Sequence, residues 1–199
     1  MQSKHIKVIT HNDLDAAVCS LLVKLKHPHH EVDIEFCDYK SIDDKVQKFC
    51  VESQLSQAGF FEELYILDIA PSKEYCEELD NLYRSGKLNR LCLVDHHSRD
   101  YADDYEWAWQ EPGNGKSAAE MFFEEFKSHL KEELSEKTFE DVVEPLVVQT
   151  TGWDTFRWRD EINKYKFSVE LNYLFKSFGI EKFIDFYEDT IKDCEDNRG

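Results

Sequence analysis

The stretch LYILDIAPSKEYCEELDNLYRSGKLNRLCLVDHH, residues 64–97, decides the fold class. Its two apolar runs predict strands over residues 64–69 and 91–95, and the pattern between them predicts a helix over residues 73–85. A strand, a helix and a second strand at this spacing predict a βαβ unit with parallel strands. The apolar centres of both strands suit a sheet that is buried on its two faces.

The same alternation extends on both sides of this stretch. Strands are expected over residues 5–10 and 32–37, helices over residues 15–26 and 42–54, and one more short strand over residues 106–110. The sequence therefore predicts an α/β fold with a five-stranded, mainly parallel sheet flanked by helices.

The second half of the chain has a different pattern. Ser117 is expected to cap a helix over residues 118–130, and helical periodicity recurs over residues 139–150, 164–178 and 181–194. We therefore expect the second half to be helical.

Composition excludes several classes of protein. The 199 residues are 41% hydrophobic and 14% aromatic, which is enough to form a core, and the net charge is −18. A chain this acidic should not bind long duplex nucleic acid over its whole surface. Any phosphate ligand would need a local basic patch or bound metal ions.

The cysteines and the N-terminus indicate a cytoplasmic protein. No two of the six cysteines form a C-x-x-C pair, and several lie in apolar runs, so we expect free thiols in a reducing compartment. The N-terminal residues lack the apolar core of a signal peptide, and no apolar run approaches the ~20 residues of a membrane span.

Acidic and histidine side chains follow three of the predicted strands. The carboxyl ends of parallel strands form one edge of a sheet, where ligands bind, so these residues are expected to meet there. An acidic residue in the helical half adds a further candidate. The candidates are His11, Asp13, Asp15, Asp68, Asp95, His96, His97 and Asp154.

So many carboxylates would repel one another strongly without cations. Carboxylates mixed with imidazoles suit Mn²⁺ above all, with Mg²⁺, Co²⁺ or Fe²⁺ as competitors. The number of ligands exceeds the needs of one ion, so we expect two divalent ions, which together can lower the pKa of a shared water and clamp a phosphoryl group.

At these residues the chain resembles the DHH phosphoesterase superfamily, and most closely the nano-RNase B type of oligoribonuclease. The resemblance covers nearly the whole chain, and the matching segments are Thr10–Asp15, Leu67-Asp68, Val94–His97, Ser117–Glu120, Trp153–Trp158 and Leu171–Phe175. It implies a manganese-dependent phosphohydrolase that forms one catalytic domain over residues 1–199.

The resemblance also implies a role for each candidate residue. One ion would be bound by His11, Asp13 and a bridging Asp68, and the other by Asp15, Asp68, His96 and Asp154. His97 would contact the scissile phosphate or the leaving oxygen, and Asp95 would orient a histidine.

The chain departs from the family pattern at two points. Ala16 stands where family members usually carry glycine, which reduces backbone freedom but keeps the side chain small. The second, substrate-gripping domain with its Gly-Gly-Gly-His motif is expected to be absent, since no such motif occurs in the sequence.

The expected reaction is hydrolysis of very short single-stranded oligonucleotides, or of small nucleotides, to nucleoside 5′-monophosphates. Substrate phosphates are expected at the basic residues Arg157 and Arg159, and at Lys116 and Ser117 where a helix begins. No membrane partner is expected, and a homodimer is left open.

The same metal centre would serve other enzymes equally well. A cyclic-dinucleotide phosphodiesterase, a 3′-phosphoadenosine 5′-phosphate phosphatase and an inorganic pyrophosphatase are the alternatives within this class. Outside it, an inactive nucleotide-binding module is the alternative.

Overall fold

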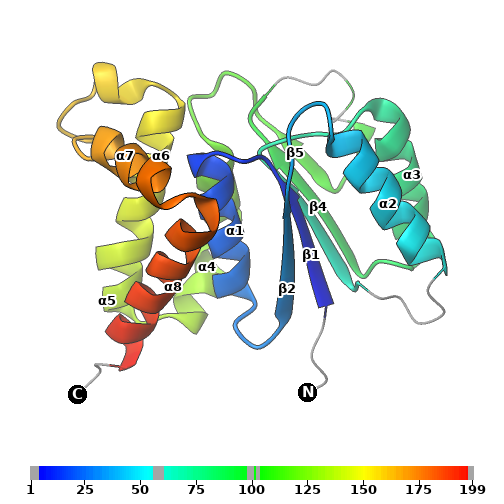
Figure 1. Cartoon of the computed structure of the whole chain (residues 1–199), viewed down its shortest axis with the longest axis horizontal. Coiled ribbons are helices and arrows are strands. Elements are labelled where there is room, and N and C mark those ends of the chain that lie inside the picture. The colour runs from blue at the N-terminus through cyan, green and yellow to red at the C-terminus, as the bar shows by residue number, and fades with distance from the viewer. Residues whose placement is uncertain (1–4, 56–60, 98–100, 102–103, 197–199) are drawn as a thin grey trace. The chain divides into compact units, whose positions relative to one another are not determined.

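The computed structural model describes residues 5–55, 61–97, 101 and 104–196, which form a parallel five-stranded sheet and a helical second half (Figure 1). The predicted α/β class is confirmed. The chain divides into two compact units. The first unit comprises the residues up to Asn12 together with His29–Asn114, and the second comprises Asp13–Pro28 and the residues from Gly115 onward.

The observed elements follow the predicted order. The strands are β1 His5–Thr10, β2 Glu31–Phe36, β3 Glu63–Leu67, β4 Arg90–Asp95 and β5 Ala108–Gln110. The helices are α1 Leu14–Lys26, α2 Ile42–Leu55, α3 Lys73–Arg84, α4 Ala118–Glu133, α5 Glu136–Thr138, α6 Glu144–Asp154, α7 Ser168–Phe178 and α8 Ile180–Asp196. A π-helical turn over Phe139–Val143 leads into α6, and a 3₁₀ turn over Arg157–Arg159 follows it.

The first unit holds the sheet, in the order β2-β1-β3-β4-β5 with every neighbouring pair parallel. Helices α2 and α3 lie side by side along it (Figure 1). Their apolar side chains, such as Phe49 and Leu79, join Ile9, Ile66 and Leu93 of the strands in one buried core. Every residue of β3 is buried, as expected of a central parallel strand.

The register aligns the ends of the strands. Thr10 pairs with Leu67, and Leu67 pairs with Val94, so the three strands reach their carboxyl ends in one row. The Thr10 hydroxyl also donates a hydrogen bond to the carbonyl oxygen of Leu67 at 2.7 Å. The next residue of each strand therefore starts from the same edge of the sheet, and these residues are His11, Asp68 and Asp95.

Strand β3 ends two residues earlier than the sequence suggested. Residues 64–69 were expected to form the strand, but Asp68 has a φ of 59°, in the left-handed region, and this turns the chain out of the sheet after Leu67. An apolar residue after the turn, Ile69, is buried in the core and extends the apolar pattern past the true strand end.

In the second unit, α1 packs against α4 and α8. Asp13 caps α1, because its carboxylate accepts a hydrogen bond from the amide of Ala16 at 3.1 Å. Lys24 forms an ion pair with Glu188 of α8. Among the described residues, no helix is long and apolar enough to cross a membrane.

Helix α7 starts at Ser168, four residues later than the periodicity predicted. Gln149 of α6 explains the delay, because its side chain donates to the carbonyl of Lys164 and accepts from the amide of Phe167, each at 3.0 Å. These bonds satisfy backbone groups of a non-helical segment. The segment places the fully buried ring of Tyr165 against Gly152 of α6.

We expect Gly152→Ala to destabilise the protein, although alanine normally stabilises a helix by about 1 kcal/mol relative to glycine. A Cβ at this position would lie 2.3 Å from Cδ1 of Tyr165 and 2.6 Å from Oγ of Ser168. Overpacking of this kind costs about 1–3 kcal/mol. Thermal unfolding of the variant should therefore show a lower Tm.

Gly86→Ala is the matched control, since its φ of +73° is strained for alanine but nothing lies within 4 Å of the added Cβ. A Tm for Gly152→Ala at or above that of the wild type would contradict the packing argument.

Candidate metal centre

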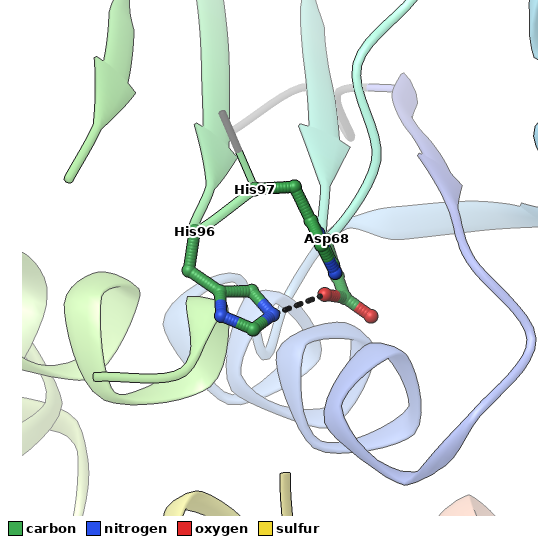
Figure 2. A group of neighbouring side chains, drawn as sticks. All are labelled: Asp68, His96 and His97. Carbon is green, nitrogen blue, oxygen red and sulfur yellow. Dashed lines mark ion pairs between the residues drawn. The ribbon is translucent and has the colours of Figure 1, made fainter. Parts of the chain in front are cut away.

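Three side chains at the carboxyl ends of β1, β3 and β4 converge in the first unit. The Asp68 carboxylate lies 3.8 Å from Nδ1 of His11 through one oxygen and 3.4 Å from Nε2 of His96 through the other. Figure 2 shows the His96 imidazole pointing at this carboxylate. The Asp68 side chain is only 1% exposed, so its charge is held almost entirely away from water.

The backbone places Asp68 between the two histidines. Its amide donates a hydrogen bond to the carbonyl of Val94 at 2.8 Å, which fixes the residue against β4. Its left-handed conformation costs about 1 kcal/mol or more for a residue with a side chain. Such strain persists where the surrounding structure imposes it, and it is concentrated at functional sites.

His97 is oriented by Asp95. One carboxylate oxygen of Asp95 accepts from the His97 amide at 3.1 Å and lies 2.8 Å from the ring atom Nδ1. Asp95 is fully buried, whereas the His97 side chain is 43% exposed. One ligand atom each of Asp68, His96 and His97 lies within 4.8 Å of the others, so His97 belongs to the same cluster.

Tyr39 is a member of this neighbourhood that sequence reasoning missed. It follows β2, a fourth strand end, and its ring centroid lies 5.3 Å from that of His11 and 6.0 Å from that of His97. The residue is 46% exposed. A tyrosine after a strand matches no metal-ligand pattern, and only its place at the same sheet edge could have indicated it.

In the second unit, the N-terminus of α4 holds Asp15 of α1. One carboxylate oxygen accepts from the amide of Ala118 at 2.7 Å, and the other accepts from the amide of Ala119 at 3.1 Å. The free amides of a helix N-terminus favour a negative charge, so this contact ties the start of α1 to α4. Asp154, the last residue of α6, offers a ligand atom within 4.8 Å of one from Asp15.

Burial and the nearby charge of Asp13 raise the pKa of Asp15 to about 7. Hydrogen bonds from Ser117, Ala119 and Ala118 act in the opposite direction but do not outweigh these two causes. The ionised form of Asp15 is therefore costly in the folded protein when no cation is bound. A divalent cation beside Asp15 would remove that cost.

The predicted phosphate-binding residues differ in their surroundings. Ser117 is fully buried. Its hydroxyl caps α4 by accepting a hydrogen bond from the amide of Glu120, and it also lies 3.1 Å from the hydroxyl of Thr151. Lys116 is paired with Glu124. Arg157 is paired with Glu161 and donates to the carbonyl of Gly115.

Arg159 is exposed and lies over two aromatic rings, with its guanidinium carbon 5.0 Å from the ring centroid of Phe156 and 5.2 Å from that of Trp158. All of these basic residues lie in the second unit.

The donor atoms of both units suit a divalent cation of intermediate hardness. The first unit offers two imidazoles around a buried carboxylate, and the second offers two close carboxylates of which one resists ionisation. Mixed imidazole and carboxylate donors are typical of Mn²⁺, Fe²⁺, Co²⁺ and Zn²⁺ sites. The residues present therefore fit a metal centre chemically.

Comparison with known proteins identifies solved structures that have a similar fold. The structure is similar to an uncharacterised protein from Helicobacter pylori G27, with a TM-score of 0.70 and 17% sequence identity over 95% of this chain and 56% of that one. It is also similar to the exonuclease RecJ bound to manganese, with a TM-score of 0.53 and 13% identity over 94% of this chain and 50% of that one. The chain thus spans about half the length of both. No protein-family model and no curated protein sequence matches it.

The raised pKa of Asp15 predicts a pH-dependent stability in EDTA. The folded protein holds this proton up to about pH 7, whereas the unfolded chain releases it near the ordinary value of 3.8. Stability is therefore lost as the pH rises from about 4 to about 7, and the loss is complete above that range. Asp15→Asn removes the titration, so its Tm relative to the wild type should rise between pH 5 and pH 7.5 and then level off.

Only the change of this Tm difference with pH is diagnostic. Asparagine also replaces one hydrogen-bond acceptor by a donor, which shifts the Tm by the same amount at every pH. Asp185→Asn, at an exposed site on α8, is the control and should show no such trend. A Tm difference for Asp15→Asn that stays constant with pH would contradict the shifted pKa.

Proposed function

We propose that this chain is a metal-dependent phosphodiesterase of the DHH phosphoesterase superfamily, which cleaves very short single-stranded oligonucleotides to nucleoside 5′-monophosphates. The observation that carries the proposal is the meeting of His11 and His96 at the two oxygens of Asp68. The fold shared with a manganese-bound exonuclease supports it, and so does the sequence resemblance.

The proposed ligand set is the one that the family resemblance implies. One Mn²⁺ ion would be bound by His11, Asp13 and Asp68, and a second by Asp15, Asp68, His96 and Asp154. When bound, two such ions would supply a nucleophile from water at neutral pH and would stabilise the charge of the phosphoryl group. The strained backbone and burial of Asp68 suit the bridging position, because a bridging carboxylate must present both oxygens from a fixed place.

His97 is proposed to act on the substrate through Nε2. Asp95 lies 2.8 Å from Nδ1, so a proton on Nδ1 would be held by this carboxylate. When the ring is doubly protonated, Nε2–H can donate to a phosphate or leaving oxygen, and the exposure of the side chain allows this contact. Asp95 stabilises the cationic ring, and thereby orients and charges His97 without touching the substrate.

The preference for short substrates is proposed from charge. The chain carries a net charge of −18, so phosphates outside the site meet a repulsive field. Arg157, Arg159 and Lys116 are the cations proposed to bind the few phosphates within reach, with Ser117 acting indirectly by capping α4. A dinucleotide needs few such contacts, whereas a long strand needs many.

The proposed roles of His96 and His97 predict that one variant loses bound metal and the other loses catalytic rate. After EDTA stripping and Mn²⁺ reloading, elemental analysis should show that Asp68→Asn loses more than one equivalent of metal and that His96→Ala loses part of its metal. His97→Ala should keep its metal but lose about 10²–10³ in kcat, the typical effect of removing one interaction with the transition state.

Asp185→Ala is the control for both measurements, because this exposed acid lies on α8 and is not in the ligand set. Equal metal loss in His96→Ala and His97→Ala would show that His97 is a ligand and that its proposed role is wrong. A wild type that is fully active with one ion or none would overturn the two-ion proposal.

The substrate is tested with 5′-labelled RNA from two to about twenty nucleotides at fixed salt. Cleavage should fall steeply with length, because added phosphates meet the acidic surface and gain no further cations. Asp68→Asn, purified in the same way, controls for contaminating nucleases. A twenty-mer cut as fast as the dimer would replace the proposal with a processive exonuclease. Turnover of cyclic di-adenylate or 3′-phosphoadenosine 5′-phosphate alone would replace it with the corresponding alternative enzyme.

A further inference from the structure

Phe156, in the second unit, combines backbone strain with an exposed aromatic ring. Only two described non-glycine residues have a positive φ: Asp68, a proposed metal ligand, and Phe156, which follows the proposed ligand Asp154 by two positions. Phe156 has a φ of 59° and is 58% exposed. A bulky residue in this conformation is a true outlier, and such outliers point to function.

The turn that holds Phe156 is fixed by its backbone. The Phe156 amide donates to the carbonyl of Trp153 at 3.1 Å, and its own carbonyl accepts from the amide of Arg159 at 3.2 Å. Glycine or asparagine would adopt this backbone more easily, so the local fold does not require a phenylalanine. The exposed ring contributes little to the core. Neither folding nor packing therefore explains why an aromatic residue stands here.

The ring belongs to an aromatic and cationic cluster. The Arg159 guanidinium lies 5.0 Å from the Phe156 centroid and 5.2 Å from that of Trp158, and Trp158 is stacked on Trp153 with an interplanar angle of 9°. Lys176 of α7 lies 5.8 Å from the Trp153 centroid. Aromatic rings interleaved with cations provide stacking surfaces for bases and charges for phosphates.

We propose that Phe156 stacks against the nucleobase of a bound nucleotide, with Arg159 supporting the other face of the ring. This inference deepens the proposed function, because it makes the base as well as the phosphate a determinant of binding. Stacking on an aromatic ring accepts every base, so the site would favour nucleotides over bare phosphate esters without selecting a sequence.

A matched phenylalanine is present in the same unit. Phe167 is 55% exposed and has Lys166 4.6 Å from its ring centroid, yet its φ of −107° is ordinary and it is remote in sequence from every proposed ligand. Like Phe156, it has an exposed ring with a basic side chain beside it. Unlike Phe156, it has an unstrained backbone and does not follow Asp154 closely in the sequence. It is therefore the control position.

The test is calorimetric titration of the Mn²⁺-loaded chain with adenosine 5′-monophosphate and with ribose 5-phosphate, which lacks the base. The wild type should bind adenosine 5′-monophosphate about 5- to 150-fold more tightly than ribose 5-phosphate, the range for one stacked base. Phe156→Leu should lose most of this preference while its affinity for ribose 5-phosphate stays unchanged. Phe156→Trp should retain the preference, and so should Phe167→Leu.

Phe156→Asn guards against a folding artefact, since asparagine suits the left-handed backbone. It should keep a normal Tm and still lose the preference for the nucleotide. Equal affinities of the wild type for the two ligands, or an unchanged preference in Phe156→Leu, would overturn the inference; the latter would leave the exposed ring as a surface for a protein partner.

Hydrolysis by the wild type is measured separately with a chromogenic phosphodiester. A Phe156-dependent preference for the nucleotide without any hydrolysis would support the stacking inference and refute the proposed enzyme. Hydrolysis by the wild type, together with a nucleotide preference that does not depend on Phe156, would support the proposed enzyme and refute the stacking inference.

Discussion

The register of the parallel sheet is the constraint on which the first unit's cluster depends. Backbone hydrogen bonds align Thr10, Leu67 and Val94 in one row, so the chain leaves three strands at the same level. This alignment alone brings residues 57 and 27 positions apart in sequence to one edge of the sheet. A slip of one residue in any strand would turn its side chains to the opposite face and remove one member of the cluster. The apolar core beneath the strands fixes the register, and the chemistry of the edge follows from it.

The cluster adds a local cost that the core must offset. Asp68 has a left-handed backbone and a carboxylate almost without exposure, and both are unfavourable in isolation. The hydrogen bond that the Asp68 amide donates to the carbonyl of Val94, together with the fully buried strand β3, nevertheless holds the residue in place. In the second unit, Asp15 carries a similar cost, seen in its raised pKa, although two amides of α4 bind it. In each unit the fold keeps a carboxylate where water cannot stabilise its charge, which is the situation that a bound cation relieves.

Much of this arrangement could be predicted from the sequence, because periodicity and strand ends are local signals. To predict that His11, Asp68 and Asp95 lie in one row, only the positions of the strands in the sequence and their parallel pairing were needed. Three features could not be predicted in this way. Strand β3 ends at Leu67 because of the left-handed backbone of Asp68, which the sequence does not indicate since the apolar Ile69 continues the pattern of a strand. The late start of α7 depends on hydrogen bonds from Gln149, a residue of another helix. Tyr39 adjoins the histidines only through tertiary structure.

The position of Ala16 shows how the chain accommodates one difference from the sequences that it resembles. It stands where the sequences that it resembles usually carry glycine, between the cap of α1 and the packed body of that helix, and it is fully buried. Its amide is the donor that Asp13 accepts, and alanine supplies that amide with better helix propensity than glycine. Because Ala16 is fully buried, a larger side chain would have to displace the groups packed around it. Alanine therefore exchanges backbone freedom for a firmer helix start, at a position whose complete burial leaves little room for a larger side chain.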